Sequence, residues 1–126
     1  MILPHRVLLV DDSLTARSFA AAALETEGDL DVSMAKSGFE ALKILPRGDF
    51  DLVITDINMP DINGLELIRF ARSHARYATT PLIIISTEGR DVDREKAMAL
   101  GANEYLVKPF TPEALVAAVR RHLTRG

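Results

Sequence analysis

The sequence has no cysteine among its 126 residues and no apolar run long enough to span a membrane. The absence of cysteine excludes disulfides, thiolate metal sites and a cysteine nucleophile, and it suits a reducing compartment. A membrane-spanning helix needs roughly 20 consecutive apolar residues, and the N-terminal segment also lacks the small-residue pattern of a signal-peptide cleavage site. We therefore expect a cytoplasmic protein with no membrane insertion.

Charge of one sign is not concentrated in any part of the chain. The 15 Lys and Arg residues are intermixed with 18 Asp and Glu residues, and the net charge is -3. Because a long basic stripe is missing, direct binding to nucleic acid is not expected. Repeats, low-complexity tracts and Gly/Ser-rich linkers are missing too, so residues 1–126 are interpreted as one domain. Gly-rich phosphate-binding patterns are also absent, which argues against a nucleotide site.

Short apolar runs of strand length alternate with segments of helical periodicity along the whole chain. Strands are expected at residues 6–10, 31–35, 52–54, 82–85 and 104–107. Helices are expected at residues 14–27, 38–45, 64–74, 88–100 and 112–123. Strict alternation of this kind predicts a doubly wound α/β fold, in which a five-stranded parallel sheet carries five helices on its two faces.

Capping residues delimit the expected helices. N-caps are predicted at Ser13, Ser37, Asn63 and Thr111. The first helix is expected to place Phe19 and Leu24 in the core. The helix at 88–100 is only weakly amphipathic, so its packing is expected to be marginal.

Polar side chains follow the apolar strands where the strands end. The first strand is followed by Asp11 and Asp12, the third by Asp56, the fourth by Ser86 and the fifth by Lys108. The carboxyl ends of parallel strands meet at one edge of the sheet, so these groups are expected to lie together. Turn preferences account for Asp and Ser at such positions but seldom for Lys.

A cluster of carboxylates predicts a divalent cation with oxygen ligands. Mg²⁺ fits best, because it binds through one or two carboxylates and adds waters and phosphate oxygens, whereas Ca²⁺ needs more ligands. With Mg²⁺, an Asp carboxylate such as Asp56 can act as a nucleophile and form an aspartyl phosphate. Lys108 and the Ser86 hydroxyl would then neutralise or hydrogen-bond the transferred oxygens.

Simpler interpretations remain open for single residues. Asp12 by itself is equally well a helix cap, and Ser86 a turn residue. Tyr105 taken alone is more often a half-buried strand aromatic. Glu88 is equally well a solvated charge.

Four motifs occur in order along the chain: VDDS at 10–13, TDINMPDINGLEL at 55–67, ISTE at 85–88 and YLVKPF at 105–110. With these motifs the chain resembles, over essentially its whole length, the receiver domain of two-component response regulators, in particular the single-domain CheY-like regulators. The resemblance implies the flavodoxin-like strand order 2-1-3-4-5.

The resemblance also implies the roles of the site residues. Asp56 would be the phosphoacceptor, and Asp11 and Asp12 would hold Mg²⁺ together with Asp56 and the backbone carbonyl of Asn58. Lys108 would pair with the phosphoryl group.

The family pattern implies a switch and a control of phosphate lifetime. Ser86 would hydrogen-bond the phosphoryl group, and Tyr105 would be the aromatic that turns inward in response. Serine at position 86 replaces the commoner threonine, so a methyl contact is lost. Asn58 and Glu88 stand where the family tunes phosphate lifetime, and this pair resembles that of rapidly self-dephosphorylating members. The bond between Lys108 and Pro109 is expected to be cis.

The implied function is a phosphorylation-dependent signalling switch and not an enzyme in the usual sense. The phosphodonor would be a sensor histidine kinase or a phosphotransfer protein. A protein target would bind the face formed by the helix at 88–100, the strand at 104–107 and the last helix. Chemotaxis or motility signalling is one expected setting. The alternatives are a pseudo-receiver that binds partners without phosphorylation, the receiver of a longer regulator, and a small phosphatase that uses Asp56 as nucleophile.

Overall fold

The computed structural model describes residues 3–87, 89 and 91–123, and within them it forms the predicted parallel sheet of five strands in the order β2-β1-β3-β4-β5. The strands are β1 (His5–Val10), β2 (Leu30–Ala35), β3 (Leu52–Asp56), β4 (Leu82–Ser86) and β5 (Glu104–Val107). The α-helices are α1 (Leu14–Glu25), α2 (Gly38–Ile44), α3 (Gly64–Ser73), α4 (Asp91–Leu100) and α5 (Pro112–His122). Two short 3-10 helices, η1 (Leu45–Arg47) and η2 (Ala75–Tyr77), follow α2 and α3.

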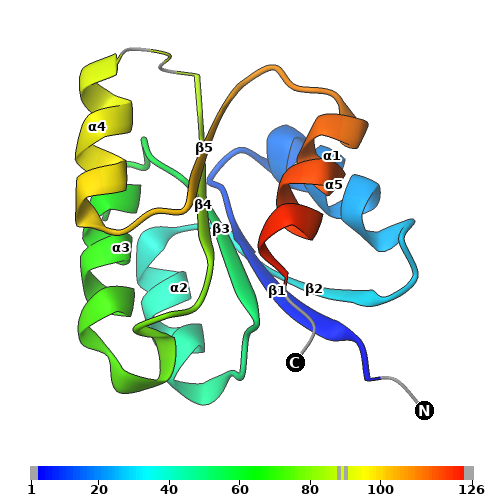
Figure 1. Cartoon of the computed structure of the whole chain (residues 1–126), viewed down its shortest axis with the longest axis horizontal. Coiled ribbons are helices and arrows are strands. Elements are labelled where there is room, and N and C mark those ends of the chain that lie inside the picture. Colours follow the sequence, from blue (N-terminus) through cyan, green and yellow to red (C-terminus); the bar gives the residue numbers. More distant parts are fainter. Residues whose placement is uncertain (1–2, 88, 90, 124–126) are drawn as a thin grey trace.

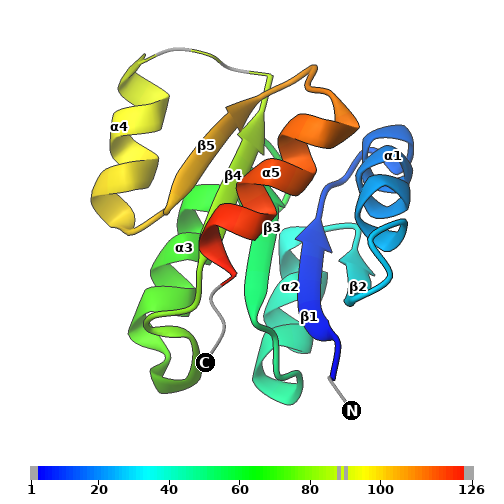
Figure 2. The same cartoon turned by 45° about the vertical axis from the view of Figure 1, so that its right-hand side comes forward.

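The helices cover the sheet in two layers (Figures 1 and 2). Helices α1 and α5 lie on one face, and α2, α3 and α4 lie on the other. Each face has its own apolar cluster, one centred on Leu9, Leu24 and Val119 and the other on Leu8, Leu67 and Tyr77. In Figure 2 the arrowheads of β1, β4 and β5 point to the same edge of the sheet. The doubly wound fold predicted from the alternating pattern is therefore confirmed.

The predicted caps set the starts of four helices. The side chains of Ser13, Ser37, Asn63 and Thr111 each accept a hydrogen bond from the backbone N–H three residues later. Helix α1 ends at Glu25, two residues earlier than predicted, because the Thr26 hydroxyl donates to the carbonyl of Ala23 and Gly28 follows with φ +81°. The predicted boundaries thus hold to within a few residues.

The expectation that Phe19 is a core residue was wrong. Its side chain is 45% exposed, whereas Leu24 is fully buried as predicted. Helix α1 faces the sheet with Ala20, Ala21 and Leu24, so Phe19 projects to its flank, where its ring lies 6.3 Å from that of Phe110. Small alanines allow the helix to lie close to the sheet, and this leaves the larger ring at the margin.

Helix α4 is the least embedded helix of the second layer. Among its ten residues Ala97 is the buried one, while Val92 and Met98 are 52% and 43% exposed. The marginal packing expected from its weak amphipathic pattern is confirmed. The predicted start of this helix, Glu88, lies outside the described residues. None of the described helices combines the length and apolar character of a membrane span.

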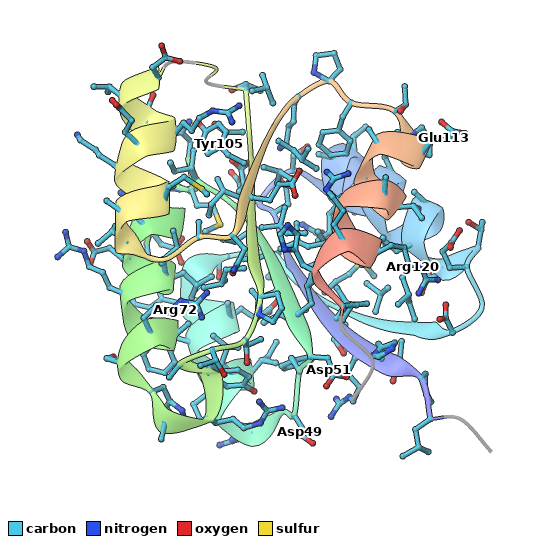
Figure 3. The ribbon with its side chains drawn as sticks, in the orientation of Figure 1. Asp49, Asp51, Arg72, Tyr105, Glu113 and Arg120 are labelled. Atoms are coloured by element: carbon cyan, nitrogen blue, oxygen red, sulfur yellow. The ribbon has the colours of Figure 1, made fainter. Side chains whose placement is uncertain are left out.

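Arg72, near the C-terminal end of α3, makes several hydrogen bonds to the turns around it (Figure 3). Its guanidinium donates to the carbonyls of Tyr77 at 2.9 Å, Thr80 at 2.7 Å and Gly101 at 2.7 Å, and to Asn103 Oδ1 at 3.0 Å. Gly101 has φ +116°, and a Cβ there would come within 2.8 Å of Arg72 Nε. One side chain therefore joins α3, the turn before β4 and the turn between α4 and β5.

Replacing Arg72 with methionine leaves the carbonyl oxygens of Tyr77, Thr80 and Gly101 without this donor. Because a buried acceptor without a partner costs about 1–3 kcal/mol, we expect Arg72→Met to lower the free energy of unfolding by about 2–4 kcal/mol. Urea titration followed by circular dichroism measures the change. Arg69→Met, on the exposed side of the same helix, is the matched control and is expected to change it by less than about 0.5 kcal/mol. Equal losses in both variants would contradict the bracing role of Arg72.

Candidate functional site

The polar groups predicted to gather at one edge of the sheet lie there. Asp56 is the last residue of β3 and Ser86 the last of β4, while Asp11 directly follows β1 and Lys108 directly follows β5. Asp11 and Ser86 are fully buried and Asp56 is 7% exposed. Asp12 is exposed, so the cluster opens to solvent on the side of this residue. The parallel sheet thus brings groups from four strands into one site.

The Lys108 ammonium bridges the two buried carboxylates. Its Nζ lies 2.8 Å from Asp11 Oδ2 and 3.1 Å from Asp56 Oδ2. One cation therefore balances two buried anions, and the carboxylate of Asp12 adds a third negative charge nearby. The site as a whole carries excess negative charge.

Burial and this ion pair shift the pKa values of both partners. Burial raises the pKa of Asp56 above its ordinary value of 3.8, and the charge and hydrogen bond of Lys108 only partly oppose it. Burial by itself would lower the pKa of Lys108, but its hydrogen bond to Asp11 and the charges of Asp56 and Asp11 prevail and raise it. Lys108 is therefore a firmly charged ammonium at neutral pH, beside a carboxylate whose ionisation is unfavourable without further positive charge.

Backbone donors hold the free oxygens of the two buried acids, and a side-chain donor holds the main chain of Asp11. Ser13 N–H donates to Asp11 Oδ1 at 2.9 Å, and Asn58 N–H donates to Asp56 Oδ1 at 3.2 Å. Arg17, in the first turns of α1, donates from Nη1 to the main-chain carbonyl of Asp11 at 2.7 Å. These contacts orient the carboxylates before any ligand arrives.

The carboxylates form a set that can hold a divalent cation. One oxygen each from Asp11, Asp12 and Asp56 lies within 4.8 Å of the others. All donors are hard oxygen atoms, and the exposed position of Asp12 leaves room for water and phosphate oxygens. This donor set fits Mg²⁺. Asn58 is exposed beside the cluster, and the predicted role of its carbonyl as a metal ligand stays a prediction.

The predicted switch residues lie on the two strands that follow the acceptor strand in the sheet, Ser86 on β4 and Tyr105 on β5. Ser86 is fully buried, and Tyr105 on β5 is 5% exposed, so its ring is turned into the protein. The Lys108–Pro109 peptide bond is cis, as expected. Glu88, the second residue expected to tune phosphate lifetime, lies outside the described residues.

The loop that follows Asp56 is anchored to α2 by a contact that the sequence analysis missed. The Asp61 carboxylate accepts from the backbone N–H groups of Phe39 at 2.9 Å and Gly38 at 3.3 Å. The loop also packs closely, since a Cβ on Gly64 would lie 2.5 Å from the carbonyl oxygen of Asp56. An Asp between turn residues gave no sequence signal for this partner, which is 22 or more residues away.

A pocket of about 370 Å³ opens beside Lys108, between α1 and the loop that leads into α5. Phe19 and Phe110 are in its apolar wall, and Ser13, whose N–H donates to Asp11 Oδ1, also lines it. The sequence analysis also missed Arg17. The pattern that could have indicated it is a basic residue in the first turns of a helix that follows an acidic strand end. Both features enlarge the site beyond the predicted residues.

Comparison with known proteins gives a consistent result. The family model of the response regulator receiver domain matches residues 7–120. The chain is 42% identical over 111 residues to the chemotaxis protein CheY1 of Helicobacter pylori, covering 87% of this chain and 90% of that protein.

Solved structures resemble the chain over nearly their full length. The chemotaxis response regulator CheY4 of Vibrio cholerae superimposes with a TM-score of 0.89 at 35% identity, covering 95% of this chain and 99% of that one. The receiver domain of sensor histidine kinase PA1611 from Pseudomonas aeruginosa has a TM-score of 0.87 at 26% identity, covering 95% and 98% of the two chains. That structure has a magnesium ion coordinated in its active-site cleft.

Removing the Asp56 charge is expected to stabilise the metal-free protein. Because the desolvation of this carboxylate outweighs its attraction to Lys108, Asp56→Asn is expected to add about 1 kcal/mol or more, or about 3–5 °C in Tm. Mg²⁺ should raise the Tm of the wild type more than that of the variant. Differential scanning calorimetry in EDTA and in Mg²⁺ measures both effects. The exposed Asp31→Asn is the control, and a metal-free Asp56→Asn less stable than the wild type would refute the expectation.

The Asp61 contact predicts a dependence of stability on pH. Hydrogen bonds from the Phe39 backbone hold the pKa of Asp61 below its ordinary value of 3.8, so its stabilisation is complete above that pH. This stabilisation is lost as the pH falls through the lowered native pKa. We expect Asp61→Ala to have a lower Tm than the wild type at pH 7, and the gap to shrink below about pH 4.

Asp61→Asn is the matched variant for this measurement, because it keeps an acceptor oxygen but cannot titrate. The difference in Tm between Asp61→Asn and Asp61→Ala should be independent of pH. A gap between wild type and Asp61→Ala that widens on acidification would show that the sign is wrong.

Proposed function

The chain belongs to the family of response regulator receiver domains, and on that premise we propose that it is a phosphorylation-operated switch that accepts a phosphoryl group on Asp56. The observation that carries the proposal is the buried contact of Lys108 with both Asp11 and Asp56 at the carboxyl end of the sheet. A lysine held between two acids, next to a third, can exchange one anionic partner for an incoming phosphoryl oxygen.

The proposed reaction is a phosphoryl transfer from a phosphohistidine of a sensor kinase or phosphotransfer protein. A carboxylate oxygen of Asp56 attacks phosphorus, the O–P bond forms, and the P–N bond breaks with its electron pair returning to the donor imidazole. Lys108 would neutralise the transferred oxygens and Ser86 would hydrogen-bond them. Asn58 N–H holds the second Asp56 oxygen, which leaves the acceptor oriented throughout.

Asp11, Asp12 and Asp56 would hold Mg²⁺, together with the carbonyl of Asn58. When bound, this ion supplies the positive charge that draws phosphoryl oxygens to a negatively charged site. The close approach of the three carboxylates supports this assignment.

The phosphoryl group would be read at a protein-binding surface. In the proposed switch, Ser86 is drawn to the new phosphoryl group and Tyr105 fills the space beside it. The face made by α4, β5 and α5 then changes its affinity for a target protein. Similarity to chemotaxis regulators supports a role in chemotaxis or motility, and Asn58 with Glu88 would set a short phosphate lifetime.

The chain would act in the cytoplasm on its own acceptor only, not as an enzyme with turnover on an external substrate. Two alternatives remain distinct: a pseudo-receiver that binds partners without phosphorylation, and the receiver part of a longer regulator. Saturable Mg²⁺ binding at the acidic cluster would exclude the first.

Exposure to a small phosphodonor with Mg²⁺ tests the function. We expect the wild type to gain one phosphoryl group by intact-protein mass spectrometry and Asp56→Asn to gain none. Asp12→Asn should slow uptake by about tenfold or more, because one cation ligand is lost. Asp49→Asn, an exposed acid at the far end of the sheet, is the control (Figure 3). Uptake by Asp56→Asn at the wild-type rate would overturn the proposal.

A further inference from the structure

Tyr105 is covered by an arginine of the neighbouring helix. The ring lies on the side of β5 that faces α4, where Figure 3 shows it between the yellow helix and the sheet. The Cζ atom of Arg94 lies 5.4 Å from the ring centroid, which is within the range of a cation–π interaction. The Tyr105 side chain is 5% exposed although Arg94 itself is exposed. The guanidinium therefore forms part of the outer cover of a buried ring.

The contact between Arg94 and Tyr105 is one of those that join α4 to the sheet. Ala97 is the buried residue of α4 and Leu100 at its end packs partly against the core, whereas Val92 and Met98 are about half exposed. A helix with so small an apolar face gains comparatively much from one contact to the sheet. The orientation of Tyr105 and the seating of α4 are thus physically linked through Arg94.

We propose that Arg94 is a positioning residue that holds Tyr105 in its inward orientation before any phosphoryl transfer and so sets the resting balance of the switch. The consequence for signalling rests on the proposed function, but the contact does not. When Tyr105 turns outward, its ring leaves the guanidinium and the interaction is lost. Loss of an exposed cation–π contact of this kind corresponds to a change of about 2- to 5-fold in the ratio of inward to outward orientations.

The geometry of the side chain makes arginine the suitable residue here. A guanidinium is planar and weakly hydrated, so it can lie over a ring while staying in contact with water. An ammonium on a lysine keeps the charge but covers less of the ring. An uncharged glutamine removes the electrostatic attraction altogether. The three residues at position 94 are therefore expected to form a series in inward population: arginine, then lysine, then glutamine.

The two tyrosines of the chain allow a direct measurement. Labelling with 3-fluorotyrosine gives one ¹⁹F signal from each. Tyr77 is fully buried, with its hydroxyl donating to the carbonyl of Leu45 at 2.6 Å, so it serves as an internal reference. The change in shift between H₂O and D₂O reports how far each ring is exposed. Tyr77→Phe assigns the signals.

In metal-free, unphosphorylated protein we expect Arg94→Gln to increase the solvent shift of the Tyr105 signal, with Tyr77 unchanged. The matched control is Lys96→Gln, which removes an equal charge from the exposed surface of the same helix. It should leave both signals as in the wild type. A Tyr105 signal in Arg94→Gln that equals the wild-type signal would overturn the proposal.

The variant Arg94→Lys distinguishes a specific effect on Tyr105 from a general disturbance of the fold. If Arg94→Gln also moves the Tyr77 signal, Arg94→Lys decides: a Tyr105 shift between those of the wild type and Arg94→Gln supports the proposal, and one equal to Arg94→Gln refutes it.

Adding beryllium fluoride and Mg²⁺ then separates this proposal from the function proposed above. A Tyr105 signal that moves inward in Arg94→Gln on this addition shows that the switch works and that Arg94 sets only its resting point. Failure of the Tyr105 signal of Arg94→Gln to move on this addition would count against the phosphorylation switch, while the Arg94 comparison in unphosphorylated protein would stand unaffected.

Discussion

The ammonium of Lys108, held between two buried carboxylates, is the interaction on which the rest of the site depends. Lys108 reaches Asp11 and Asp56 from the end of β5. Both contacts require that β1, β3 and β5 end at the same level of the sheet. Without this cation, two carboxylates buried side by side would repel each other and protonate. With it both can stay ionised, and the remaining excess of negative charge would favour a divalent cation.

Much of this arrangement follows from the sequence, because strand ends are easy to locate. An apolar run that stops at a charged residue places that residue at the carboxyl edge, and a parallel sheet brings all such edges together. Asp11, Asp56, Ser86 and Lys108 were found in this way. The strand order and the cis bond at Lys108–Pro109 came from the family resemblance, since neither is encoded in periodicity.

The features that sequence analysis did not find depend on where a side chain points between distant segments. Periodicity places Phe19 on the apolar side of α1, but the alanines beside it occupy the sheet and leave the ring at the flank. Arg72 looks like one of many helix cations, although its partners lie in turns far along the chain. Asp61 likewise looks like an ordinary turn residue in the sequence. Its contact with α2 depends on the conformation of the loop, which the sequence pattern does not reveal.

The elements of the second helical layer differ in how many contacts hold them to the sheet. Arg72 braces the lower end of α3, and Asp61 anchors the acceptor loop to α2, so the elements beneath the acceptor are held by hydrogen bonds. Helix α4 has a small buried face and meets Tyr105 through the charged side chain of Arg94. A local change at the acceptor moves whichever neighbour is held least strongly. Arg72 also holds the turn between α4 and β5, so in the proposed switch the change would reach the part of α4 that precedes this turn, where Arg94 meets Tyr105.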